Sequence, residues 1–275
     1  MADRRLTPAR LDLAASHLKG EVEAAHFAEG ILSSVIWGRT ALRAAPSDGA
    51  SQDSELLRGE IVTVYERKNG WAWVQAKADQ YVGYVREAAL GPAAPIDMRV
   101  ILPLTPLLSA PDVKSPLRDM LPLNAGLKRE TMEGDFVTTD GGFVHVRALA
   151  PLDRFAPDFV AVAEHFLGVP YVWGGKTFQG LDCSGLIQTS LQAAGFSAPR
   201  DTDMMEQSLG QTILGAKLKR GDLVFWKGHM GVMRDGEMLL HANAFHMQVT
   251  SELLSMASER IGAPVTMIKR LNSPY

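Results

Sequence analysis

The sequence predicts an α+β domain preceded by one or two small β-barrels, and two observations lead to this prediction. Residues 31–152 contain short runs of alternating apolar and polar residues separated by turn residues, which is typical of small barrels. Residues 153–275 begin with helical patterns and end with short strands, an order typical of an α+β domain. Residues 1–30 carry a loose apolar stripe, which predicts one amphipathic helix.

Length and composition limit the possible classes of protein. A chain of 275 residues is long enough for two or more domains. Its net charge of −3 and its lack of a basic run argue against a nucleic-acid partner. No apolar run reaches the roughly 18 residues of a membrane span. We therefore expect partners that are neither nucleic acid nor membrane, while the oligomeric state is not specified by the sequence.

The cysteine content and the N-terminal residues bear on the cellular compartment. The chain has one cysteine, so it cannot form an intrachain disulfide. The N-terminus has the positive charge of a signal peptide without the apolar core that would follow it. These features predict a cytoplasmic protein. A secreted or periplasmic protein without its leader would have the same features, so this alternative stays open.

The barrel region divides into two parts. Residues 31–92 contain alternating strands at 59–66, 71–74 and 81–85, with a hairpin turn at Lys68-Asn-Gly70. Residues 93–152 repeat this pattern more weakly, with a second hairpin signal at Asp140-Gly-Gly142. We therefore expect a first barrel at 31–92 and a second barrel-like domain at 93–152.

The single cysteine, Cys183, stands where a glycine-rich loop gives way to a helical pattern. Leu186, Ile187 and Leu191 follow at helical spacing, and Gly195 is a good helix stop. The unpaired N–H groups and the dipole of a helix start stabilise a thiolate, which is the nucleophilic form of cysteine. A lone cysteine is more often a small buried side chain. Its neighbours, aspartate, serine and glycine, favour a nucleophile instead.

A cysteine nucleophile needs a base, and the base needs a third group that orients it. His229 precedes a predicted strand, and His241 lies in the next strand along the chain. A hairpin closed near Asp235-Gly236 would bring His241 next to the His229 ring.

A zinc site is the rival use of these side chains. Its possible ligands would be Asp182, Cys183, His229, His241 and His246. However, the sequence has neither a His-Glu-x-x-His motif nor two cysteines at short spacing. We therefore expect no metal and no cofactor.

The motifs around these residues resemble, in order, those of the NlpC/P60 cysteine peptidases. They are Tyr171-Val-Trp-Gly-Gly175, Leu181-Asp-Cys-Ser-Gly-Leu186, Arg220-Gly-Asp-Leu-Val-Phe225, His229-Met-Gly-Val232 and His241-Ala242. The resemblance implies a reduced papain-like fold and hydrolysis of bacterial cell-wall (murein) peptides. It also implies that Cys183 is the nucleophile, His229 the general base and then acid, and His241 the third member.

The first barrel resembles a bacterial SH3-like (SH3b) domain in the motifs Arg43-Ala-Ala-Pro46, Leu56-Leu-Arg-Gly-Glu60, Gly70-Trp71 and Tyr81-Val-Gly-Tyr-Val85. An N-terminal segment (1–30), SH3b domains at 31–92 and 93–152, and an NlpC/P60 domain at 153–275 resemble the γ-D-glutamyl-L-diamino acid endopeptidases. This resemblance implies cleavage between γ-D-Glu and the diamino acid in peptides with a free N-terminal L-Ala, during peptidoglycan recycling.

The same resemblance implies a set of substrate-binding residues. In the catalytic domain they are Tyr171, Trp173, Ser184, Arg200 and Asp201. From the first SH3b domain, one acidic residue and one tyrosine are expected against the pocket. The candidates are Glu55 or Glu60 and Tyr81 or Tyr84, of which we favour Glu55 and Tyr81.

Two other functions stay open at this point. The chain could be a secreted wall hydrolase that its SH3b domains anchor to murein. It could also be a binding or scaffold protein that keeps an inactive peptidase fold. The presence of Cys183, His229 and His241 together favours an enzyme.

Overall fold

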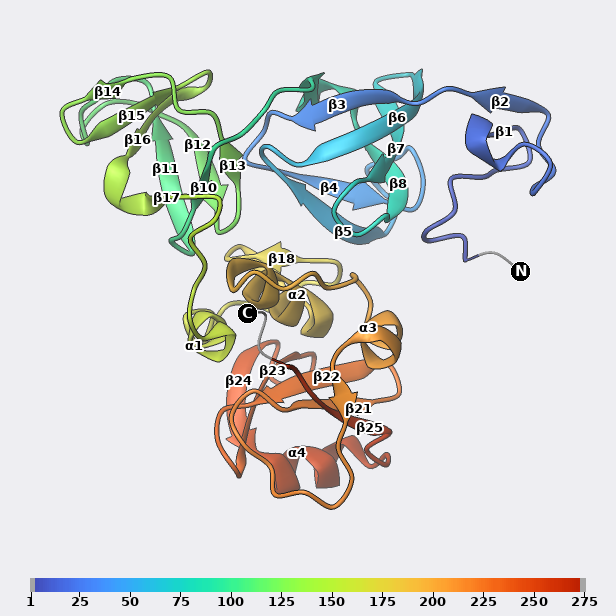
Figure 1. Cartoon of the computed structure of the whole chain (residues 1–275), viewed down its shortest axis with the longest axis vertical. Coiled ribbons are helices and arrows are strands. Elements are labelled where there is room, and N and C mark those ends of the chain that lie inside the picture. The colour runs from blue at the N-terminus through green and yellow to red at the C-terminus, as the bar shows by residue number, and fades with distance from the viewer. Residues whose placement is uncertain (1–2, 273–275) are drawn as a thin grey trace. The chain divides into compact units, whose positions relative to one another are not determined.

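The computed structural model describes residues 3–272, and the chain divides into two compact units, residues 1–152 and 153–275 (Figure 1). The N-terminal unit is built almost entirely of strands, and the α-helices lie in the C-terminal unit. Within residues 3–272, every helix is too short or too polar to cross a lipid bilayer.

The first barrel of the N-terminal unit is a seven-stranded sheet in the order β5-β4-β8-β7-β6-β3-β9. Valine, tryptophan and tyrosine are frequent in its central strands and suit a pleated, packed surface; in the strand 61–68 buried valines alternate with half-buried residues, whereas the strand 71–76 is buried along most of its length. Its elements are β3 (Ile31–Val35), β4 (Arg39–Arg43), β5 (Gln52–Leu57), β6 (Ile61–Lys68), β7 (Trp71–Ala76), β8 (Val82–Arg86), the 3₁₀ helix η2 (Glu87–Ala89) and β9 (Leu90–Pro92).

The second barrel repeats the connectivity of the first. Its first and last strands pair with each other, its second strand forms a hairpin with its third, and a 3₁₀ helix precedes its last strand, as in the first barrel. Its elements are β10 (Met98–Val100), β11 (Leu104–Leu108), β12 (Leu117–Pro122), β13 (Gly126–Leu127), β14 (Met132–Glu133), β15 (Phe136–Thr139), β16 (Gly142–His145), η3 (Val146–Ala148) and β17 (Leu149–Pro151).

The N-terminal segment is not the predicted helix. It forms two short parallel strands, β1 (Leu13–Ala15) and β2 (His26–Ala28), with the 3₁₀ helix η1 (Ser16–Leu18) between them. Ala14 and Ala15 are fully buried, whereas Leu11, which began the apolar stripe, is 88% exposed. Strand pairing thus satisfies the backbone hydrogen bonds of this segment in place of a helix.

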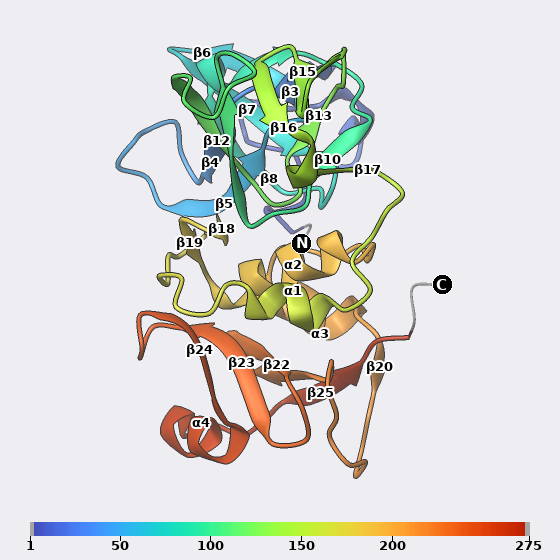
Figure 2. The ribbon, with the colours of Figure 1, turned by 90° about the vertical axis from the view of Figure 1, so that its left-hand side faces the viewer.

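The C-terminal unit has three layers, with α1, α2 and α3 on one face of an antiparallel sheet and α4 on the other (Figure 2). The sheet order is β20-β25-β21-β22-β23-β24. The predicted α+β class is therefore confirmed. The elements are α1 (Phe159–Glu164), β18 (Lys176–Thr177), β19 (Gly180–Leu181), α2 (Cys183–Ala193), α3 (Thr202–Ser208), β20 (Gln211–Thr212), β21 (Leu223–Trp226), β22 (His229–Met233), β23 (Met238–Asn243), β24 (Gln248–Leu253), α4 (Leu254–Ile261) and β25 (Met267–Arg270).

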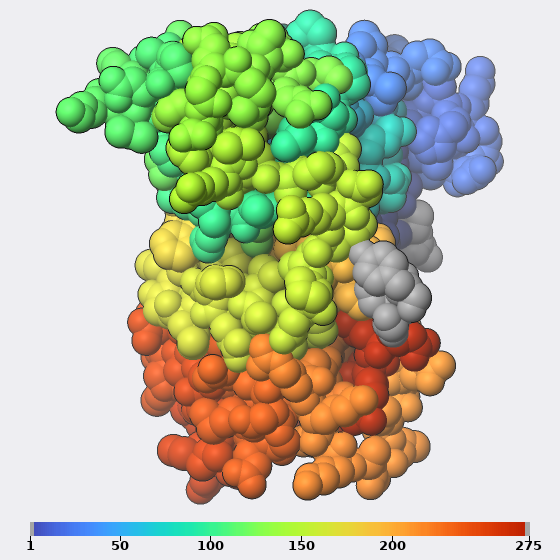
Figure 3. Space-filling view, turned by 60° about the vertical axis from the view of Figure 1, so that its left-hand side comes forward, coloured from blue at the N-terminus to red at the C-terminus, as the bar shows by residue number. Residues whose placement is uncertain are grey.

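The segment that leads to α2 is fixed to the last part of the sheet. Backbone hydrogen bonds join Gly168 and Val169 to Val249, and Tyr171 to Met247. In Figure 3 this segment, in yellow, lies directly above the orange and red strands that it contacts. These bonds therefore fix the position of the chain just before the glycine-rich loop that precedes α2.

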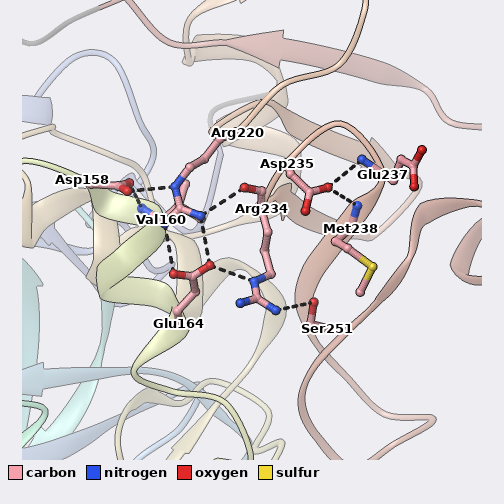
Figure 4. Close-up of polar contacts among 9 residues, drawn as sticks. All are labelled: Asp158, Val160, Glu164, Arg220, Arg234, Asp235, Glu237, Met238 and Ser251. Atoms are coloured by element: carbon pink, nitrogen blue, oxygen red, sulfur yellow. Dashed lines mark hydrogen bonds and ion pairs between the residues drawn. The ribbon is translucent and has the colours of Figure 1, made fainter.

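A charged network ties α1 to the loops of the sheet (Figure 4). The guanidinium of Arg220 donates to Asp158 at 2.8 Å and to both oxygens of Glu164 at 3.0 Å. Arg234 donates to Glu164 at 2.8 Å. Arg220 also holds the carbonyl oxygen of Arg234 at 3.1 Å, so the hairpin between β22 and β23 is held against α1. Arg220 begins the Arg-Gly-Asp-Leu motif, and this network is its structural role.

We expect Glu164→Gln to lower the free energy of unfolding by about 1–2 kcal/mol at pH 7, because two arginines lose their shared anion. Hydrogen bonding to Arg220 lowers the pKa of Glu164 to about 2. The unfolded carboxyl takes up its proton near its usual pKa, whereas the folded one holds its charge to lower pH. The wild type therefore loses this stabilisation as the pH falls from about 4.5 to 2.

Urea unfolding at pH 7, 4 and 2.5 measures this effect, with the exposed Glu237→Gln as a matched control. A Glu164→Gln deficit that does not shrink at pH 2.5 would contradict the assignment.

Candidate active site

Helix α2 begins with an aspartate cap. The Asp182 side chain accepts from the N–H of Gly185 at 2.7 Å, which satisfies one of the free donors of the first helical turn. Its other oxygen accepts from the N–H of Gly174 at 2.8 Å. One carboxylate thus joins the glycine-rich loop to the helix that starts with Cys183.

The charge of Asp182 is balanced by a buried arginine. Arg200 is only 1% exposed and holds Asp182 with two parallel hydrogen bonds of 3.0 and 2.6 Å. It also donates to the hydroxyl of Ser184 at 2.8 Å. A two-pronged arginine–carboxylate pair in a dry interior fixes orientation as well as charge. The residues on either side of the cysteine are therefore held rigidly.

Close backbone packing explains the glycine of the Cys-Ser-Gly motif. A Cβ atom at Gly185 would lie 2.1 Å from the carbonyl oxygen of Gly175. Neither the loop backbone nor the helix backbone can move away cheaply, so only glycine fits there.

The thiol of Cys183 is buried, and its surroundings include two hydrogen-bonding groups. Its sulfur lies 3.7 Å from the hydroxyl of Thr202, and the backbone N–H of Met230 bonds to it. Burial raises the pKa of the Cys183 thiol, and the charge of Asp182 raises it further, while Thr202 and Met230 act in the opposite direction. The helix start was predicted to stabilise a thiolate. In this structure burial outweighs that effect, so the thiol needs a base.

The candidate base belongs to a chain of hydrogen bonds on the sheet. Strands β22 and β23 pair as predicted, and Nε2 of His229 lies 2.9 Å from Nδ1 of His241. Nε2 of the fully buried His241 lies 2.8 Å from Oε1 of Glu252. Burial lowers the pKa of His229 to about 4, with a further contribution from His241. The N–H of Met230 bonds to the Cys183 sulfur. The candidate base, His229, is the residue before Met230 and the first residue of β22.

Comparison with known proteins decides the family of this arrangement. The sequence profile of the NlpC/P60 family matches residues 168–263, which contain the helix start and both histidines. The C-terminal unit is an NlpC/P60 domain. The profile described as a bacterial dipeptidyl-peptidase SH3 domain matches residues 42–90, within the first barrel.

Several known proteins are similar to this chain. The γ-D-glutamyl-L-lysine dipeptidyl-peptidase of Bacillus subtilis is 27% identical over 69% of this chain and 71% of its own length. Dipeptidyl-peptidase 6 of Lysinibacillus sphaericus is 32% identical over 32% of this chain and 33% of its own length. The crystal structure of an NlpC/P60 family protein from Bacillus cereus aligns over 87% of this chain and 99% of that one, with a TM-score of 0.74 at 18% identity. This last likeness shows a common fold.

Two of the predicted pocket residues are buried next to Asp182. Arg200 and Ser184 were expected to contact a substrate, but both are buried and bonded to Asp182 or to each other. They hold Asp182 beside Cys183, and their expected contact with a substrate stays a prediction.

The other predicted pocket residues of this domain surround the helix start. Burial raises the pKa of Tyr171 to about 12, and the proximity of Cys183 adds to this rise. Trp173 is 65% exposed in the loop that Asp182 holds. Asp201 is half-buried at the N-cap position of α3, next to Thr202.

The SH3 candidates lie in the other unit. Glu55 is paired with Arg39 at 2.6 Å, and Tyr81 is buried just before β8. Their expected place against the pocket stays a prediction.

Sequence reasoning did not find Thr202, Glu252 or Arg260. Thr202 could have been found from its position after Arg200-Asp201. No sequence pattern indicated Glu252, because its contact with His241 arises only when β23 pairs with β24.

We expect Arg200→Met to lower the free energy of unfolding by about 3–5 kcal/mol, because it leaves the Asp182 carboxylate buried without its partner. Urea unfolding measures the loss, and the exposed Lys217→Met serves as the control. A deficit below 1 kcal/mol (roughly the value of a surface pair) would show that Asp182 does not depend on this arginine.

We expect His229 to titrate near pH 4 in the folded protein, well below the usual value of 6.5. The unfolded chain takes up this proton at higher pH than the folded chain, so protonation favours unfolding. Stability relative to His229→Gln should therefore fall as the pH drops from 6.5 towards 4. Proton NMR of the imidazole ring measures the pKa directly, and a value near 6.5 would contradict the burial of the ring.

Proposed function

We propose that the NlpC/P60 domain is a cysteine peptidase that hydrolyses amide bonds in peptides of the bacterial cell wall. The observation that carries this proposal is the buried thiol of Cys183 at a capped helix start, beside a strand whose first residue is a histidine with a histidine partner. The named dipeptidyl-peptidase relatives support the class of substrate.

In this mechanism His229 takes the proton of the thiol as the sulfur attacks the carbonyl carbon of the scissile bond. The carbonyl oxygen becomes an oxyanion, which backbone N–H groups at the start of α2 stabilise. The protonated His229 then gives its proton to the leaving nitrogen as the C–N bond breaks. Water, deprotonated by His229, attacks the thioester, and the acyl product leaves while the thiol regains its proton.

For the bond itself, we propose the amide between γ-D-Glu and a diamino acid in short peptides with a free N-terminal L-Ala. The relatives' names support cleavage after γ-D-glutamyl. Asp201 supports recognition of the amine, because it is next to Thr202, whose hydroxyl is 3.7 Å from the attacking sulfur. In this proposal the Asp201 carboxylate pairs with the ammonium of a two-residue acyl group. Such a specificity suits the recycling of released murein peptides.

The test uses L-Ala-γ-D-Glu-meso-diaminopimelate and its N-acetylated twin, with products followed by mass spectrometry. We expect cleavage of the free peptide between the second and third residues. Cys183→Ala should lower the rate by about 10⁴-fold or more. Asp201→Asn should lower kcat/KM for the free peptide by about 10–100-fold and leave the slow reaction of the acetylated peptide unchanged.

Equal cleavage of both peptides by the wild type would remove the amine-reading pocket and favour a wall hydrolase, which intact murein sacculi would then test. Cleavage of neither peptide, with wild type equal to Cys183→Ala, would overturn the peptidase assignment for this substrate class.

A further inference from the structure

We propose that Glu252, held in place by Arg260, is a positioning residue that sets the protonation pattern of both histidines, so that His229 presents a free lone pair to Cys183. This inference rests on the proposed function and adds two residues to its machinery. Neither residue touches the substrate in this proposal, since both act through His241.

The carboxylate of Glu252 determines where the proton of His241 lies. An ionised carboxylate can only accept hydrogen bonds, so the 2.8 Å contact with Nε2 of His241 requires a proton on that nitrogen. A neutral imidazole carries one N–H, which leaves Nδ1 of His241 with a lone pair. Glu252 therefore selects one tautomer of a ring that is fully buried and cannot exchange partners with solvent.

The tautomer of His241 determines the tautomer of His229. Because Nδ1 of His241 must accept, the 2.9 Å contact requires His229 to donate from its own Nε2. The remaining nitrogen of neutral His229, Nδ1, then has the lone pair and can take the thiol proton. With the opposite tautomers, Nδ1 of His229 would already carry a proton and could not act as a base.

Arg260 holds the carboxylate of Glu252 in place. Its guanidinium, on α4, pairs with the same Oε1 atom that faces His241, and it lies 4.5 Å from the centre of the Phe245 ring. The other titratable group near Glu252 is His246, whose Nδ1 is 3.8 Å from Oε1. The carboxylate thus has cations or N–H donors from β23, from the following turn and from α4.

The carboxylate also stabilises the next state in the reaction. When His229 has accepted the proton, its positive charge is stabilised by the negative charge of Glu252 through the neutral His241 ring that lies between them. The transferred proton stays on Nδ1, from which it is later given to the leaving nitrogen, and no further proton acceptor is needed.

Glu252→Gln is the decisive variant. It keeps the shape of the side chain, but the group that faces His241 no longer has to be a hydrogen-bond acceptor. A glutamine amide can turn its NH₂ group towards His241, which would reverse both tautomers.

Nitrogen-15 NMR of the imidazoles reports the tautomers. Alkylation by iodoacetamide reports the thiol at a single site, because the chain has one cysteine. We expect protons on Nε2 of both rings in the wild type. In Glu252→Gln and Glu252→Leu we expect loss of this pattern and alkylation about 10–100-fold slower.

Glu259→Gln, an exposed carboxylate of α4, is the matched control and should change neither readout. Arg260→Met should also disturb the tautomer pattern and slow the alkylation, but less than Glu252→Gln does. If Glu252→Leu does not fold, Glu252→Gln decides alone. Unchanged tautomers and an alkylation rate within twofold of wild type in Glu252→Gln would overturn the proposal. Neither readout uses a peptide, so this result is separate from any failure of the proposed substrate.

Discussion

The active site depends first on the buried ion pair between Asp182 and Arg200. Without the carboxylate, neither the loop at Gly174 nor the first turn of α2 would have its hydrogen-bond acceptor. Without the guanidinium, that carboxylate would be a buried charge with only dipoles around it, which is costly in a low-dielectric interior. The pair therefore fixes the loop and the helix as one rigid piece, and Cys183 is the residue at their junction.

The proposed nucleophile and its proposed base are held by different layers of the domain. The helical layer fixes the sulfur through Asp182, and the sheet fixes the His229 ring through His241 and Glu252. The N–H of Met230 is the point where the sheet meets the thiol. Burial makes both groups neutral at rest, since it raises the pKa of the thiol and lowers that of the imidazole. In the proposed mechanism the charge forms as the sulfur attacks a substrate carbonyl.

Much of this organisation was predictable from the sequence, because it is encoded in local patterns. The spacing behind Cys183 and the glycine at 195 predicted α2, and the turn at Asp235-Gly236 predicted the pairing that joins the two histidines. The burial of Arg200 was not predictable, because an arginine is usually exposed and its partner lies 18 residues away. Glu252 was missed for a similar reason. The helix expected in residues 1–30 is not formed, because a loose apolar stripe over a short segment does not by itself decide between helix and strand.

Covalent labelling with a substrate-shaped reagent, L-Ala-γ-D-Glu-diazomethyl ketone, followed by peptide mapping tests the proposed active site most directly. We predict saturable labelling of Cys183, which His229→Ala abolishes and which is much slower with the N-acetylated reagent. Such a result would join the nucleophile, its base and the amine-reading pocket in one measurement. Labelling of Cys183 no faster than that of free glutathione, or equal labelling in His229→Ala, would contradict the claim that this helix start is an activated nucleophile.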